Sequence, residues 1–256
     1  MTTSFKSLTL HVMKALGLFR LARIATGGRL RILCYHGLSL HDEHLFQPRL
    51  FMRPELLRRR LKALRDQGFP ILSLDEALDA LERGTLPRGA VVLTFDDGFV
   101  SNLDPGVAIL REFDAPATIY VTTYYAVDTR PVFRLVVRYL FWKTTCPTLD
   151  LGALELGEDW GGTVDLANPV TRDRTLWRLI RHGESSLAED GRERLARTLA
   201  ERLGLSYDDL LESRALSLMT TDEIRAAAEA GGSIQLHTHR HRFPAEERSA
   251  RREIVE

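Results

Sequence analysis

Residues 91–98 of the chain read VVLTFDDG and join an apolar run to a pair of carboxylates. The β-branched run VVL predicts a buried strand, so Asp96 and Asp97 follow at the point where a strand ends. Two neighbouring like charges repel each other, and their burial is costly unless a cation lies beside them. A bound metal ion would supply that cation, and Gly98 would allow the sharp turn around it.

The composition is that of an ordinary globular protein with a sizeable core. The chain has 256 residues, of which 44% are hydrophobic and 27% are charged, enough for one large domain or two small ones. Its 35 Lys and Arg residues balance 35 Asp and Glu residues. Because this balance leaves no overall positive field, we expect no nucleic-acid binding. The distant Cys34 and Cys146 have no metal-type spacing, which favours buried thiols.

Apolar strands and amphipathic helices alternate around the acidic pair. The expected strands are residues 30–35, 71–72, 91–93 and 117–121, and the expected helices are 54–67, 75–83 and 105–113. Ser73 is a suitable N-cap for the second helix, with Glu76 at the capping-box position. This order predicts an α/β fold with a parallel sheet, in which ligands bind at the carboxyl ends of the strands.

The pattern changes between about residues 126 and 218, where we expect a helical insertion. Helices are predicted over residues 130–142, 172–182 and 187–203. After the insertion, Thr220 or Thr221 caps a helix through Ala230, and residues 233–236 form one more short strand. That strand ends directly before His237.

The segment His237-Thr238-His239-Arg240-His241 follows the last predicted strand. Neutral imidazole is a good ligand for zinc and related divalent ions, and two histidines with a carboxylate leave coordination positions open for water and substrate. Taken alone, this segment would be a basic polar loop and the acidic pair a solvated turn. Because both follow strands of one sheet, we favour a shared metal site.

These residues resemble the signature motifs of the polysaccharide deacetylase family, the NodB-homology domain, similar to carbohydrate esterase family 4. Residues 94–98, TFDDG, resemble the first motif, and His237-Thr238-x-x-His241 resembles the second. The early Tyr35-His36 and the segments 68–76, 115–121 and 220–232 are also similar to the family. The resemblance covers about residues 31–125 and residues 219 to the end, but not the segment between them.

The resemblance implies a distorted (β/α) barrel and a metal-dependent hydrolase that removes N-acetyl groups from amino sugars in a polysaccharide, oligosaccharide or glycolipid precursor. By this resemblance Asp96 is the general base, and Asp97, His237 and His241 hold a divalent metal, for which zinc is the first expectation. We also consider His36, at the carboxyl end of the first strand, as a substrate contact. The expected partner is a glycan.

Three further motifs of the family are absent from the sequence. They supply an arginine beside the base, an Asp and Trp that line the sugar site, and a Leu with a general-acid histidine. The sequence ends at Glu256, in a helix expected over residues 245–256. We therefore expect a deacetylase-like domain over residues 29–256 whose barrel is incomplete at the C-terminus. The alternative function is a non-catalytic or degenerate relative that binds glycan or metal.

Residues 1–28 predict an amphipathic N-terminal helix. His11, Lys14, Arg20 and Arg23 interrupt its apolar residues before the run reaches the length of a signal segment or a spanning helix. Two roles are open: the helix packs on the domain, or it makes a peripheral contact with an anionic membrane surface. Without a signal peptide or transmembrane helix, we expect a cytoplasmic protein, with the inner face of the membrane as its contact.

Overall fold

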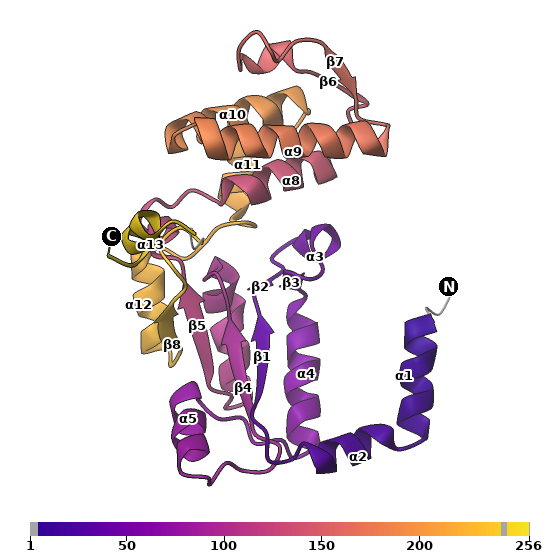
Figure 1. Ribbon diagram of the computed structural model, residues 1–256, viewed down its shortest axis with the longest axis vertical. Helices are drawn as coiled ribbons and strands as arrows, with labels where there is room; N and C mark the ends of the chain where they lie inside the picture. Colours follow the sequence, from indigo (N-terminus) through magenta and orange to yellow (C-terminus); the bar gives the residue numbers. More distant parts are fainter. Residues whose placement is uncertain (1–4, 242–244, 256) are drawn as a thin grey trace.

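The computed structural model describes residues 5–241 and 245–255. Its centre is a sheet of four parallel strands in the order β1-β4-β5-β8 (Figure 1). The strands are β1 (Arg31–Tyr35), β4 (Val91–Phe95), β5 (Ala117–Val121) and β8 (Ser233–Leu236). The predicted α/β class with a parallel sheet is confirmed, and within the described residues this sheet is open rather than closed into a barrel.

The second strand of the sheet, β4, is the most deeply buried, and all five of its residues are buried. A parallel strand covered on both faces must be continuously apolar, which explains the run before Asp96. The strands β1 and β8 form the two edges of the sheet and keep exposed positions, including Ile32 and Leu236. The sheet therefore brings Asp96 and Asp97 to its interior and the histidines to one edge.

Four helices in the described part of the chain accompany the sheet, namely α4 (Pro54–Asp66), α5 (Leu74–Glu82), α6 (Ala108–Glu112) and α12 (Thr221–Glu229). Three of them, α4, α5 and α12, have clear start signals. The predicted capping box of Ser73 and Glu76 is confirmed, and Thr220 forms a second one with Glu223. The helix expected over 105–113 is confirmed, because helical backbone continues from Pro105 into α6, and the extended Asp104 before the proline marks its start. The expected strand at 71–72 is reduced to one bridge, between Ile71 and Val91.

The segment between β5 and α12 forms a helical layer beyond the carboxyl ends of the strands (Figure 1). It contains α7 (Thr123–Val127), α8 (Phe133–Lys143), β6 (Thr148–Asp150), β7 (Thr163–Asp165), α9 (Pro169–Ser186), α10 (Glu189–Arg202) and α11 (Tyr207–Ser213). Its buried side chains, such as Phe141, Leu179 and Leu199, form a core separate from the core around the sheet. Short elements at 37–52, namely α3 (Glu43–Phe46), β2 (Gly37–Leu38) and β3 (Phe51–Met52), lie between the two layers.

The chain begins with two helices where the sequence predicts one. They are α1 (Phe5–Ala15) and α2 (Leu18–Ala25), and Gly17 between them has a φ of 70°, which breaks the helical path. Neither these helices nor any other described helix is long and apolar enough to cross a membrane. Near the other end, α13 (Glu247–Val255) matches the helix expected over 245–256, whose final residue lies outside the described part of the chain.

Candidate metal centre and cleft

Three side chains converge at the carboxyl edge of the sheet. Asp97 follows the interior strand β4, while His237 and His241 follow the edge strand β8. One ligand atom from each lies within 4.8 Å of the other two. Asp97 Oδ1 is 3.0 Å from His241 Nε2 and 3.6 Å from His237 Nε2. Ligands about 2.1 Å from one ion lie roughly 3.0 to 3.4 Å apart, so the cluster has the spacing of a metal site.

The carboxylate of Asp97 has the environment of a ligand. Asp97 is buried, and its Oδ1 atom is buried without a well-directed hydrogen bond, although His241 Nε2 lies close to it. The Asp97 carboxylate raises the pKa of His241, while burial of the imidazole opposes that change. A metal ion would satisfy the buried oxygen and would displace the proton that this pairing favours on His241. The residues present therefore fit a divalent cation.

Local backbone geometry fixes the position of Asp97. Its φ is 72°, and Gly98 follows with a φ of 79°. A Cβ on Gly98 would lie 3.0 Å from the Val121 side chain, so this position requires glycine on two grounds. Thr122 donates its hydroxyl hydrogen to the Asp97 carbonyl oxygen at 3.2 Å. The strand end of β5 thus holds the turn that presents the carboxylate.

The three histidines of the loop after β8 have different neighbours. The His239 ring is 2.9 Å from the Thr123 hydroxyl, and its carbonyl oxygen accepts a hydrogen bond from the Tyr124 backbone. Thr238 and His241 both have positive φ, at 61° and 53°, so the loop turns sharply between the histidines. His239 therefore ties the loop to α7 and points away from the cluster, as its alternation with His237 and His241 predicts.

Asp96 has a neighbour, Cys34, that the sequence pattern does not indicate. Asp96 is half-buried, and its Oδ2 atom accepts a hydrogen bond from the Cys34 thiol, with Sγ at 3.1 Å. Partial burial and the Asp96 carboxylate raise the pKa of Cys34 to about 11, so the thiol keeps its proton. The prediction of a buried thiol is wrong for Cys34, which is exposed, and Cys146 is half-buried. Cys34 lies on β1, which is an edge strand of the sheet formed by the described residues.

His36 occupies the expected place at the carboxyl end of β1. It is half-buried, and its imidazole has no hydrogen-bond partner in the described part of the chain. It does not belong to the cluster of Asp97, His237 and His241, nor to the wall of the cleft that opens above them. Its assignment as a substrate contact stays a prediction.

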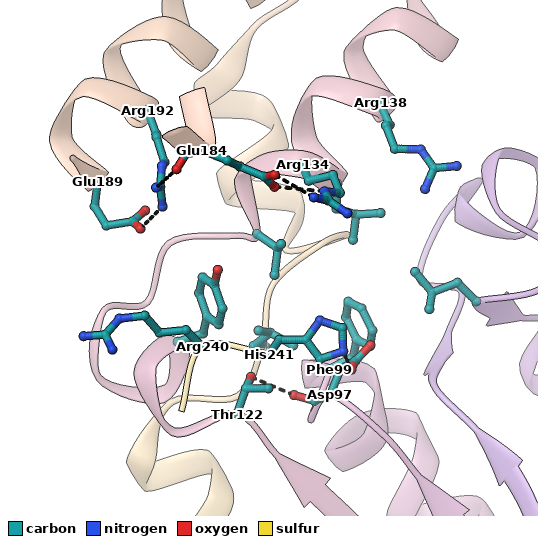
Figure 2. Close-up of a pocket in the computed structure, with 15 residues that line it drawn as sticks. Asp97, Phe99, Thr122, Arg134, Arg138, Glu184, Glu189, Arg192, Arg240 and His241 are labelled. Atoms are coloured by element: carbon teal, nitrogen blue, oxygen red, sulfur yellow. Dashed lines mark hydrogen bonds and ion pairs between the residues drawn. The ribbon is translucent and has the colours of Figure 1, made fainter. Parts of the chain in front are cut away.

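A cleft of about 350 Å³ lies above Asp97 and His241, between the sheet and the helical layer (Figure 2). Its floor contains Asp97, Thr122 and His241, and its opposite wall carries charged side chains from α8, α9 and α10 (Figure 2). The lining residues are Leu50, Asp97, Phe99, Thr122, Tyr125, Val132, Arg134, Leu135, Arg138, Glu184, Glu189, Arg192, Leu218, Arg240 and His241. The space is of the size that a small ligand or part of a larger one can occupy.

The charged wall of the cleft is largely paired. Arg134 forms a bidentate ion pair with Glu184, and Arg192 pairs with Glu189. Arg138 differs, because its half-buried guanidinium has no hydrogen bond, ion pair or ring contact within the described residues. Its five N–H groups are available to a polar group in the cleft. Arg138 could not be identified from the sequence, since nothing in a helical pattern shows which arginine lacks a partner.

Comparisons with known proteins agree on one family. Residues 83–142, which include TFDDG, match the family model described as polysaccharide deacetylase. The poly-β-1,6-N-acetyl-D-glucosamine N-deacetylases of Escherichia coli strains K12 and O157:H7 are each 36% identical over 80 residues. This alignment covers 31% of the chain and only 12% of each relative.

Several solved deacetylase structures show a distant likeness. A deacetylase of Streptococcus pyogenes, solved with acetate, is 18% identical, with 79% of this chain and 80% of that chain covered and a TM-score of 0.35. IcaB from Ammonifex degensii is 19% identical, with 82% and 84% covered and a TM-score of 0.35. The family match and the two curated relatives thus show that part of the chain, around TFDDG, is similar to the polysaccharide deacetylase family.

Proposed function

We propose that this chain is a metal-dependent hydrolase that removes N-acetyl groups from amino sugars in a polysaccharide, oligosaccharide or glycolipid precursor. The observation that carries the proposal is the convergence of Asp97, His237 and His241 below a cleft at the carboxyl edge of the sheet. The curated relatives, named as N-deacetylases of an N-acetylglucosamine polymer, support the reaction class. In this proposal the deacetylase domain begins near residue 29 and carries the helical insertion at about 126–218.

Asp97, His237 and His241 would hold the ion, and zinc suits two imidazoles and one carboxylate. Three protein ligands leave a position open, as catalytic rather than structural sites do. When bound, the ion would polarise the acetamide carbonyl and lower the pKa of a water molecule. The positive φ of Asp97 and the hydrogen bond from Thr122 would keep the carboxylate in place during these changes.

Asp96 would act as the general base of the reaction. It follows β4 directly before the ligand Asp97, so the backbone keeps base and metal centre adjacent. The Cys34 thiol donates to Oδ2 of Asp96, which orients the carboxylate and leaves its other oxygen to accept a proton from water. Because a thiol with a raised pKa stays neutral, it can orient Asp96 without adding a charge.

The metal content and the activity test this function together. We expect purified protein dialysed against zinc to retain about one equivalent per chain and to release acetate from N-acetylglucosamine oligomers. Asp97→Asn keeps a residue that tolerates positive φ but removes the charge, so it should lower zinc affinity by at least about tenfold. Asp114→Asn is the matched control, because Asp114 also has a positive φ, of 47°, away from the cluster.

The outcomes separate the alternatives. If the protein binds no divalent metal, or if Asp97→Asn binds it as tightly as Asp114→Asn does, the assignment of the centre is wrong. Stoichiometric metal without acetate release would instead favour the non-catalytic relative that binds glycan or metal. Elemental analysis and an acetate assay on the same samples distinguish these results.

His36 and Arg138 would contact the substrate from different sides of the site. His36 lies at the end of β1, and Arg138 lies on the wall of the cleft, where no described residue pairs with its guanidinium. Loss of one hydrogen bond to the sugar should raise KM about fivefold in His36→Gln or Arg138→Gln. Arg181→Gln, an exposed position on α9 outside the cleft, should leave KM unchanged. A KM equal to that of the Arg181 variant would remove the residue concerned from the substrate site.

A further inference from the structure

We propose that α1 and α2 form a peripheral anchor that lies on a bilayer containing anionic phospholipids. The first observation is charge. Residues 1–41 contain six Lys or Arg residues and no Asp or Glu, in a chain whose 35 basic and 35 acidic residues balance only when the whole chain is counted. Such a segment carries a local positive field that the composition of the whole chain conceals, and anionic lipids attract it.

The second observation is a line of exposed apolar side chains on α1 and its extension. Leu8, Val12 and Leu16 are 57%, 50% and 67% exposed. They are spaced by four residues, so they lie along one side of the helix. In Figure 1, α1 stands apart from the sheet and from its covering helices. Nothing in the described part of the chain therefore covers this apolar line.

The third observation is the orientation of α2, which turns its apolar side away from the domain. Arg23 lies over the Phe69 ring at 4.2 Å and donates to the Gln67 carbonyl oxygen at 2.7 Å. Leu21, on the far side of the helix from Arg23, and Ile24, about a quarter turn from Arg23, are 61% and 58% exposed. A helix that packs on its own domain would bury the apolar side. Of the two roles open from the sequence, this arrangement favours the membrane surface.

A bilayer suits this surface better than a second copy of the chain does. Pairing two copies through α1 and α2 would bring two positive segments together without an acidic residue to oppose them. An anionic bilayer offers both an apolar layer for the leucines and negative headgroups for Lys14 and Arg20. The helix α2 ends just before β1 begins, at the amino ends of the strands, so the anchor leaves the cleft at the carboxyl ends uncovered.

Vesicle sedimentation of the full chain tests the anchor. We expect binding to phosphatidylcholine vesicles that contain phosphatidylglycerol, and weaker binding as salt is added. The double substitution Leu21→Ser and Ile24→Ser should lower vesicle affinity by about tenfold or more. The matched control is Leu78→Ser with Leu81→Ser on α5, a pair that is 46% and 50% exposed at the same spacing, and it should bind like the unaltered chain.

Two more measurements make the result decisive. Lys14→Gln and Arg20→Gln should each lower affinity for the anionic vesicles by about fivefold. Circular dichroism should be the same for all variants, since the altered side chains are exposed. The proposal is overturned by equal binding of the two serine pairs or by equal binding to vesicles without phosphatidylglycerol. It is also overturned if light scattering finds a dimer that the α2 pair dissociates while no variant binds vesicles.

Discussion

Cys34 is the residue whose chemistry departs most from its appearance in the sequence. Its thiol is held protonated beside Asp96 and serves as a hydrogen-bond donor rather than as a nucleophile. Side chains of the edge strand β1 point alternately to its two faces, so every second one is exposed to solvent. One of these, Cys34, faces the carboxylate of Asp96, which follows the neighbouring strand β4. The pairing therefore depends on the register of β1 against β4.

A hydrogen-bond donor at position 34 should affect turnover more than stability. Cys34→Ala removes the donor to Asp96 and should lower kcat about fivefold. Cys34→Ser restores a donor of similar size and should recover most of that loss. Acetate release under saturating substrate measures both variants. If serine and alanine lower kcat equally, Cys34 does not orient Asp96 through its hydrogen bond.

At the scale of elements, an ion pair at the first turn of α12 connects this helix to the end of the helical insertion. Thr220 caps the helix, the Glu223 carboxylate accepts a hydrogen bond from the Thr220 backbone N–H, and Arg214 forms an ion pair with Glu223. Burial would raise the pKa of Glu223, but the hydrogen bonds from Arg214 and from Thr220 outweigh it and lower that pKa. The helix that precedes β8 and the histidines is thus fixed at its first turn.

Loss of this carboxylate should destabilise the protein in a pH-dependent way. Glu223→Gln should cost about 1 to 2 kcal/mol of unfolding free energy at neutral pH. Because the folded pKa lies below the unfolded value of about 4.3, the contribution is complete above that pH and disappears as pH falls through the folded pKa. Urea unfolding of both proteins between neutral and acidic pH measures the difference.

The control for this prediction is Asp222→Asn, which alters a neighbouring carboxylate that is 87% exposed and pairs only with Arg225 among the described contacts. It should change the unfolding free energy by less than about 0.5 kcal/mol. A difference between Glu223→Gln and the unaltered chain that persists unchanged in acid would contradict the role of the ionised carboxylate.

Elements with strong local signals were predictable from the sequence. The run 117–121 and the strand 233–236 match β5 and β8, and Ser73 caps its helix as expected. The hairpin of β6 and β7 was not predictable, because each strand has three residues and Leu149 is buried by helices distant in sequence. The break at Gly17 was missed because a single glycine inside an amphipathic pattern is usually tolerated.

The candidate site was predictable in its ligands and not in its surroundings. Carboxylates and histidines at strand ends indicated Asp97, His237 and His241 before their spacing was measured. The roles of Asp96 and of the ligands stay predictions until metal binding and activity are measured. The partners of these residues, such as Cys34 for Asp96, depend on strand order, which local patterns do not contain.

At the scale of the whole molecule, two separate cores meet at the cleft. The sheet supplies the floor with Asp97 and His241, and the helical layer supplies the charged wall (Figure 2). An amino-sugar polymer entering there would contact both layers at once. Because the candidate ligands lie on the floor and Arg138 lies on the wall, strand ends in the sequence indicate the candidate metal centre and say nothing about Arg138.

Because the sheet is open, an ion bound at the candidate metal centre would affect the stability of one of its edge strands. Asp97 belongs to β4, and the histidines belong to the edge strand β8, so an ion held by all three would cross-link strands on either side of β5. Amide hydrogen exchange should then slow over residues 233–241 when zinc is added, while β1, the other edge strand, exchanges at an unchanged rate. Equal slowing at both edges would indicate general tightening instead. The ion would thus hold the edge strand β8 in register with β5.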